Sequence, residues 1–272
     1  MLYCKQINLH NKNDSLSQIY GLIPARAKVL DIGCATGSLA SALNQNKKCH
    51  VVGLEFNPQS VAICQKSGFF AEIIQYDMNN FNVNDFPKYI NFFDYIVCAD
   101  VLEHLLQPEE ILKKLKHLLQ EDGKMIISLP NVAHASIKTN LLLNDFTYTK
   151  MGILDKTHLH FYTYKNIAQL LSLCDLKIIK VSSVNMPADG WQPHKISELP
   201  PDIADFILKD KHSHIMQYIM LCAHQKTSVK ENSDTLNTLS KKVLKPNLIS
   251  IIKRVIMLKM PKLIDCIEQF KK

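Results

Sequence analysis

Short apolar runs alternate with stretches of helical periodicity along most of the chain. Apolar runs at residues 27–33, 50–55, 70–77, 92–100 and 124–130 have the length of buried strands. Helices are expected to begin near residue 38 and to cover residues 57–67 and 108–119. Strands that alternate with helices in this way are typical of βαβ units. The pattern therefore predicts an α/β fold, with a parallel sheet that carries helices on both faces.

The pattern becomes less regular after residue 130. Shorter helices are expected around residues 137–143 and 163–173, and two late strands at 176–184 and 214–224. A total of seven strands follows. The segment between the last two strands, residues 185–213, contains the only tryptophan of the chain. Connections of this length are usually functional or mobile, so this one is a candidate part of a site.

The turn after the first strand carries the most specific motif, VLDIGCATGSLA at residues 29–40. Gly33 and Gly37 bracket this turn, and glycines allow a backbone to approach a ligand closely. A dinucleotide-binding turn with the spacing G-x-G-x-x-G would need glycine at positions 35 and 38. These positions hold Ala35 and Ser38. The motif therefore argues against a pyrophosphate-binding turn.

The same segment resembles the first motif of class I S-adenosylmethionine-dependent methyltransferases, although Ala35 replaces the middle glycine common there. The resemblance implies a Rossmann-like sheet with S-adenosylmethionine as the cofactor. It places Glu55 on the ribose hydroxyls and the pair Asp77-Met78 near the adenine. An acid at the end of a single strand is often only a helix cap, but acids at successive strand ends favour a ligand. The expected cofactor-binding residues are Asp31, Gly33, Cys34, Gly37, Glu55, Phe56, Asp77, Met78 and Asp100.

Methyl transfer is a displacement at an activated carbon, so the protein mainly aligns the nucleophile, and a hydroxyl acceptor also benefits from a general base. Ligands of open α/β sheets lie beyond the carboxyl ends of the strands, which makes residues 131–162 the expected acceptor segment. We predict His158 as the base and Asp155 as its orienting partner. The alternative is that both residues only hold their loop together. His134 is a further catalytic candidate, or it caps the helix that follows.

Residues 130–134 and 152–159 resemble a bacterial methyltransferase subgroup associated with O-antigen and other surface-polysaccharide genes. His160 stands where that subgroup commonly has Arg. The resemblance implies O-methylation of a saccharide or a lipid-linked cell-surface precursor. Two alternatives stay open: an O-methyltransferase for small molecules or quinones, and a non-catalytic cofactor-binding subunit that docks a partner. In related quinone-pathway enzymes a similar segment holds a divalent metal, which Asp100, Glu103 and His104 could copy; no metal is predicted here.

The net charge of +7 at first suggests a nucleic-acid or membrane partner. Residues 229–272 hold ten basic and four acidic residues, so most of the excess belongs to the end of the chain. With only two arginines, a nucleic-acid partner is not expected. Residues 241–262 form a predicted basic amphipathic helix, which either lies on an anionic membrane, binds a partner or packs on its own domain.

The domain organisation follows from these patterns. Residues 1–26 form an N-terminal segment, residues 27–224 the methyltransferase-like domain, and residues 225–272 a basic C-terminal tail. The eight cysteines are scattered without a CxxC pair, and no apolar run has the length of a membrane span. A cytoplasmic protein is therefore expected, with a peripheral position at the inner face of the membrane if the tail binds lipid.

Overall fold

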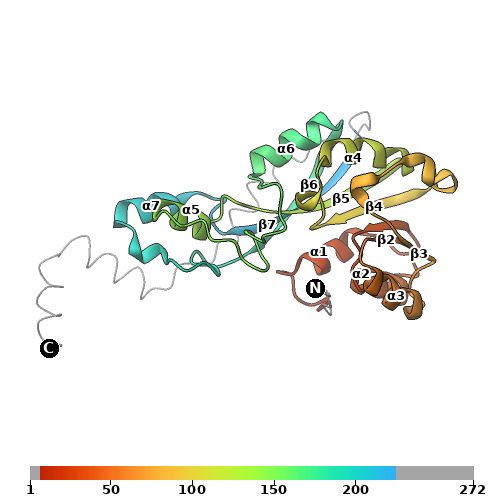
Figure 1. Ribbon diagram of the computed structural model, residues 1–272, viewed down its shortest axis with the longest axis horizontal. Coiled ribbons are helices and arrows are strands. Elements are labelled where there is room, and N and C mark those ends of the chain that lie inside the picture. The colour runs from red at the N-terminus through yellow and green to blue at the C-terminus, as the bar shows by residue number, and fades with distance from the viewer. Residues whose placement is uncertain (1–6, 225–272) are drawn as a thin grey trace, which may run out of the picture.

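The computed structural model describes residues 7–224, so the predicted amphipathic tail lies outside the described part of the chain. A seven-stranded sheet with the order β3-β2-β1-β4-β5-β7-β6 forms its centre (Figure 1). The first five strands run parallel, and β7 is antiparallel to both of its neighbours. The predicted mostly parallel sheet of seven strands is confirmed. Its strands are β1 (Lys28–Ile32), β2 (His50–Glu55), β3 (Glu72–Gln75), β4 (Phe93–Ala99), β5 (Leu119–Pro130), β6 (Leu176–Asn185) and β7 (Ile215–His224).

Five of the helices lie where the periodicity predicts them, and two do not. The expected ones are α2 (Ser38–Lys47), α3 (Pro58–Ser67), α4 (Pro108–Leu115), α5 (Ala135–Leu142) and α6 (Tyr164–Leu173). The pattern misses α1 (Ser15–Leu22) and α7 (Pro201–Lys209). Both are short, and local signals do mark them. The Asp14 side chain accepts a hydrogen bond from Ser17 N at 3.0 Å, and Pro201 occupies the first position of α7.

Alternate residues of the central strands face two separate cores. In β1, Leu30 and Ile32 belong to the core that also holds α4 and α6, whereas Val29 faces the core that holds α1 and α2. Both faces of the strand are therefore buried. This burial explains why β1 reads as a continuous apolar run in the sequence. With helices packed on both faces of the central sheet, a ligand reaches it at the carboxyl edge.

Strand β5 begins five residues earlier than predicted. The polar pair Asp122-Gly123, between the helix predicted at 108–119 and the strand predicted at 124–130, lies inside β5. The pairing of β4 with β5 shifts in register between Phe93 and Tyr95, and this irregularity accommodates the polar residues.

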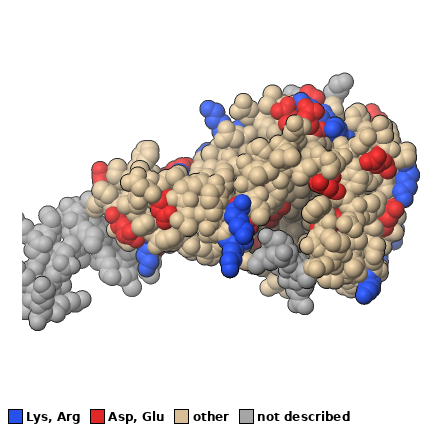
Figure 2. All heavy atoms as spheres, viewed as in Figure 1, with Lys and Arg blue, Asp and Glu red and all other residues tan. Residues whose placement is uncertain are grey.

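A smaller unit of α5 and α7 lies beyond the carboxyl ends of the parallel strands, at the left in Figure 1. It has small apolar cores of its own, one of which joins Ala135 to Leu199, Ala204 and Ile207. Between residues 7 and 224, no helix has the length and apolar character needed to cross a bilayer. Acidic and basic side chains are interspersed on the face seen in Figure 2, as the nearly neutral charge of this part of the chain implies.

Candidate functional site

The turn between β1 and α2 is held in an unusual backbone conformation. Gly33 has φ +65°, and a Cβ atom there would lie 2.8 Å from Val101 Cγ2. Ala35 also has a positive φ of 48°, which costs a residue with a side chain about 1 kcal/mol. The Glu55 carboxylate supports the turn, because its Oε2 accepts a hydrogen bond from Ala35 N at 2.9 Å. The backbone of Ala35 thus takes the conformation that glycine adopts readily.

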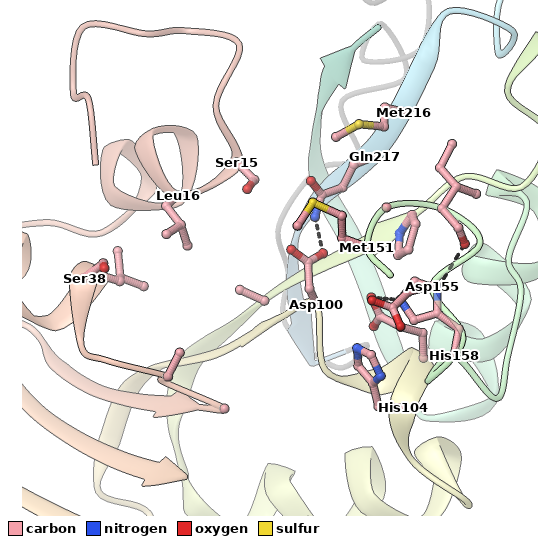
Figure 3. A pocket seen from close by; sticks show the side chains of 18 of the residues that line it. Ser15, Leu16, Ser38, Asp100, His104, Met151, Asp155, His158, Met216 and Gln217 are labelled. Carbon is pink, nitrogen blue, oxygen red and sulfur yellow. Dashed lines mark hydrogen bonds and ion pairs between the residues drawn. The ribbon is translucent and has the colours of Figure 1, made fainter. Parts of the chain in front are cut away.

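A cavity of about 310 Å³ opens beside this turn, at the carboxyl ends of β1 and β4. Four of the nine predicted cofactor-binding residues line it: Asp31, Gly33, Cys34 and Asp100. Figure 3 shows Asp100, His104, Asp155 and His158 on one side of the cavity, with Ser15, Leu16 and Ser38 across from them. The structure therefore joins the glycine turn and the predicted acceptor segment in one cavity, although they are far apart in sequence.

The other five predicted cofactor residues lie outside the wall of this cavity. Gly37 is the N-cap of α2, and a Cβ atom there would lie 2.8 Å from the Phe70 ring. Phe56 is exposed, Met78 is buried, and Asp77 caps a short 3-10 helix by accepting from Asn79 N at 3.0 Å. Glu55 uses one carboxyl oxygen on the turn and the other on Asn57 N. All of them except Gly37 lie at or after the ends of β2 and β3, farther out in the sheet. Their predicted contacts with a cofactor stay predictions.

Asp31 is the acidic side chain at the base of the cavity. Only 3% of its surface is exposed. Burial, reinforced by the negative charge of Glu55, raises the pKa of Asp31 to about 7. A cationic ligand in the cavity would favour the ionised form of this carboxyl. The cavity therefore contains, at low dielectric, a buried carboxyl group that has no cationic side chain beside it among the residues of the cavity wall.

Asp100 is positioned by two side chains that the sequence analysis did not single out. Its Oδ1 accepts hydrogen bonds from the Gln217 amide and, at 3.4 Å, from Ser128 Oγ. Gln217 in turn donates to Ser128 Oγ at 3.1 Å. These contacts, visible in part in Figure 3, tie the end of β4 to β5 and β7. Gln217 lies in an apolar late strand. Only the antiparallel return of β7 beside β5 brings it to the cavity.

His158 presents one ring nitrogen to the acidic side of the cavity. Its Nδ1 lies 3.0 Å from the carbonyl oxygen of Ile153, so Nδ1 carries the proton and Nε2 is the free acceptor. Nε2 lies 4.0 Å from Oε1 of Glu103. Burial, together with the neighbouring His104, lowers the pKa of the His158 imidazole. A neutral imidazole with a free Nε2 can accept a proton from a bound hydroxyl.

Glu103 is fully buried beside this imidazole. Neither of its carboxyl oxygens has a hydrogen-bond partner among the described residues. Burial and the negative charge of Asp100 raise its pKa well above the ordinary value. A carboxyl group in this environment holds its proton to a higher pH than an exposed glutamate, because burial disfavours the ionised form. Glu103 is one of the residues that line the cavity, although both of its carboxyl oxygens are buried. From the sequence, Glu103 is a candidate only as a metal ligand.

The predicted partnership between Asp155 and His158 differs from the observed contacts. Oδ1 of Asp155 accepts hydrogen bonds from the backbone N and the hydroxyl of Thr157, at 2.8 and 2.7 Å. Only the backbone carbonyl of Asp155 contacts His158, by accepting from its backbone N at 3.0 Å. Asp155 therefore shapes the turn that presents the imidazole. The orienting contact to the ring comes from the carbonyl oxygen of Ile153.

His134, the third catalytic candidate, lies outside the cavity wall. Its ring is fully buried, and Nδ1 accepts a hydrogen bond from Ser136 N at 3.1 Å, which makes it the N-cap of α5. Nε2 faces the carbonyl oxygen of Met186 at 3.3 Å. Both ring nitrogens are engaged, and burial lowers the pKa of His134 to about 4. The structure thus supports the capping alternative over a catalytic role.

One cluster in the described part of the chain has the geometry of a metal site. Ligand atoms of Glu103, His104 and His158 all lie within 4.8 Å of one another. A carboxylate with two imidazoles is a donor set that suits divalent transition metals. The set differs from the expected one, because His158 takes the place of Asp100. His104 Nδ1 also contacts Thr157, whose carbonyl oxygen lies at 3.2 Å.

Comparison with known proteins bears on the family and the fold of the chain. The model of a methyltransferase domain family matches residues 8–181. A ubiquinone biosynthesis O-methyltransferase of Actinobacillus pleuropneumoniae is 28% identical over 153 residues, which are 55% of this chain and 64% of that protein. One of Xylella fastidiosa is 31% identical over 106 residues, 39% of this chain and 42% of that protein. The matched part thus spans less than two thirds of either relative.

A similar fold occurs in a solved structure. An S-adenosylmethionine-dependent methyltransferase of Archaeoglobus fulgidus superposes with a TM-score of 0.55 at 15% identity, over 79% of this chain and 94% of that one.

Proposed function

The chain belongs to the methyltransferase domain family, and we propose that it transfers the methyl group of S-adenosylmethionine to a hydroxyl group of an acceptor molecule. The observation that carries this proposal is the convergence, in one cavity, of the glycine turn after β1 with the buried pair of Glu103 and His158. A cofactor turn alone would support binding only. An imidazole with a free nitrogen on the opposite wall adds the means to remove a proton.

The cofactor side of the cavity is formed by the turn and by Asp31. Gly33 and Cys34 line the cavity, and Gly33 has no side chain that would narrow it. The Asp31 carboxylate offers a negative charge to a cationic group of the cofactor. When bound, S-adenosylmethionine supplies an electrophilic methyl carbon on a sulfonium. Asp100, fixed by Gln217 and Ser128, lies between this side and the histidines.

The acceptor side is formed by Glu103 and His158. Their facing atoms are 4.0 Å apart, too far for a direct hydrogen bond. A hydroxyl group that bridges the two atoms from the cavity side would donate a hydrogen bond to Nε2 of His158 and accept one from the protonated carboxyl of Glu103. As the oxygen bonds to the methyl carbon, its proton passes to Nε2. The Glu103 carboxyl thereby gains the partner that it lacks among the described residues.

Two classes of acceptor fit this chemistry. The relatives are named as ubiquinone biosynthesis O-methyltransferases, which favours a phenolic hydroxyl on a small ring molecule. The motifs at residues 130–134 and 152–159 motivate a saccharide or lipid-linked hydroxyl instead. Neither the fold nor the relatives' names support the saccharide, so the phenolic acceptor comes first. A membrane contact through the tail would serve either acceptor, and it concerns residues outside the described part.

The same side chains could instead bind a divalent cation. Glu103, His104 and His158 would hold it, and it would act as a Lewis acid on the acceptor oxygen. A metal on Nε2 would occupy the lone pair that the base needs, so the two mechanisms exclude each other at His158.

A labelled-cofactor assay tests the proposed function. The full chain is incubated with methyl-labelled S-adenosylmethionine and, separately, with catechol, a methyl glycoside and a lipid-linked glycan. We expect label on the phenolic oxygen of catechol. Binding of S-adenosylmethionine, measured by calorimetry, with no label transferred to any acceptor would instead favour the non-catalytic binding subunit. Absence of cofactor binding would refute the proposal.

A further inference from the structure

Trp191 is the only tryptophan of the chain, and its side chain is 66% exposed. The loop that carries it is nevertheless anchored on both sides. Before it, Asp189 Oδ1 accepts a hydrogen bond from Ile196 N at 2.9 Å; after it, His194 N donates to Asn140 Oδ1 at 3.4 Å. The loop therefore holds a large apolar ring at the surface in a defined place.

The ring lies beside the cavity. A Cβ atom on Gly152 would be 3.2 Å from two carbons of the Trp191 ring, so the ring packs directly on this glycine. Gly152 has φ +94°, and it lines the cavity together with Met151 and Ile153. Met151 is itself 54% exposed. Met151 belongs to the wall of the cavity, and Trp191, which lies outside that wall, packs on the neighbouring Gly152. We call these two exposed apolar side chains the rim.

The charges around the cavity limit what this rim can bind. The described residues that line it carry the carboxyl groups of Asp31, Asp100 and Asp155, besides the protonated Glu103, and include no Lys or Arg. A phosphate or carboxylate near the reacting hydroxyl would therefore lose its hydration without gaining a cationic partner. An uncharged ring carries no such penalty, and its face can stack on an indole.

On these grounds we infer that Trp191 and Met151 form a subsite that binds the uncharged ring of the methyl acceptor and excludes anionic acceptors. The inference rests on the proposed function, because it places the hydroxyl group of that ring next to Glu103 and His158. Two kinds of ring share this chemistry. A phenol would stack with its π face, and a sugar with its C–H face. The experiment below distinguishes them.

The single tryptophan makes binding directly observable. The full chain, saturated with S-adenosylhomocysteine, is titrated with catechol and separately with methyl α-D-glucopyranoside while the Trp191 emission is recorded. We expect a saturable change with one of the two, and its identity assigns the kind of ring. When neither probe produces such a change, the inference is overturned. This titration needs no methyl transfer, so a probe that binds without being methylated would count against the proposed function and not against the subsite.

Substitutions then test the residue and the charge argument. By calorimetry, Trp191→Ala should weaken binding of the active probe about 3- to 10-fold, Trp191→Phe should retain most of it, and affinity for S-adenosylhomocysteine should not change. Phe206→Ala, which removes a 79% exposed ring on α7, is the matched control and should have no effect. Equal affinities of Trp191→Ala and the unaltered chain would overturn the inference. If the ring is phenolic, 3,4-dihydroxybenzoate should bind at least about 10-fold more weakly than catechol; equal binding would overturn the charge argument.

Discussion

Nε2 of His158 lies 4.0 Å from Oε1 of Glu103, and both side chains are buried in the wall of the same cavity. The imidazole has a free acceptor nitrogen, and the carboxyl has no hydrogen-bond partner in the described part of the chain. Two adjacent buried polar groups that do not satisfy each other are costly in a folded protein. One ligand oxygen placed to the side of the line that joins the two atoms could form a hydrogen bond with each of them.

Replacing His158 with Ala should remove the proton acceptor. We expect kcat to fall at least about 100-fold, with the affinity for S-adenosylmethionine changed by less than about threefold, because the ring lies across the cavity from the cofactor turn. Turnover is measured with labelled cofactor, and cofactor binding by calorimetry. Unchanged turnover would reject His158 as the base.

His134→Ala provides the histidine control for that experiment. This substitution removes the N-cap of α5 and leaves the cavity wall intact. We expect a loss of about 1 kcal/mol in the free energy of unfolding with kcat nearly unchanged at a temperature where the variant is folded. A loss of kcat comparable to that of His158→Ala would return His134 to the catalytic candidates.

The pH dependence of kcat should follow the same residue. Burial lowers the pKa of His158, so the base stays unprotonated well into mildly acidic solution. With saturating cofactor, the acidic decline in kcat should therefore lie below the ordinary histidine value of 6.5. A decline centred above that value would show that another group controls the reaction.

Glu103→Leu should separate stability from activity. The folded protein binds a proton on Glu103 at pH values where the unfolded chain has already lost it, because the folded pKa is raised. The contribution of Glu103 to stability therefore falls as pH rises above the ordinary glutamate value of 4.5. A leucine side chain carries no such penalty. In thermal unfolding, the free energy of unfolding of the variant should therefore rise relative to that of the unaltered chain as pH increases, by about 1–3 kcal/mol near neutrality. Its kcat should fall about 10-fold or more; full activity would remove Glu103 from the mechanism.

Asp31→Asn should weaken the binding of the cofactor and stabilise the folded protein when no cofactor is bound. Asp31 has a pKa of about 7 in the folded protein and 3.8 in an unfolded chain, so its contribution to stability is lost as pH rises from about 4 to 7. Without cofactor, Asp31→Asn should melt above the unaltered chain at pH 8, and the difference should shrink at pH 5. Its affinity for S-adenosylmethionine should fall about 10-fold or more at pH 8. A variant that binds the cofactor normally would show that Asp31 is only structural.

Treatment with a chelator distinguishes the base mechanism from the metal mechanism. We expect turnover to survive EDTA followed by gel filtration, because His158 acts through its free nitrogen. Loss of turnover that Mg²⁺, Mn²⁺ or Zn²⁺ restores would assign Glu103, His104 and His158 as metal ligands instead. Elemental analysis of the purified protein provides a readout that does not depend on activity.

Much of the fold could be predicted from the pattern of apolar and polar residues, because the burial of each strand or helix determines that pattern. Strands buried on both faces must be apolar throughout, and this property makes β1, β2 and β4 visible in the sequence. The glycine turn was visible for a similar reason, since few residues tolerate the backbone conformation found at Gly33. By contrast, α1 and α7 were missed although they are at least as long as α4 and α5, so length alone does not explain which helices the pattern reveals.

The residues by themselves thus determined the α/β architecture, the cofactor turn and the segment that contains His158. Only the tertiary structure decided which groups face one another. Glu103 meets His158, Gln217 fixes Asp100, and Trp191 packs on Gly152, and each of these pairs joins segments that are distant along the chain. The physical reason is that hydrophobic periodicity reports which face of an element is buried. The partner of a polar side chain depends on strand order and on the paths of the connecting loops.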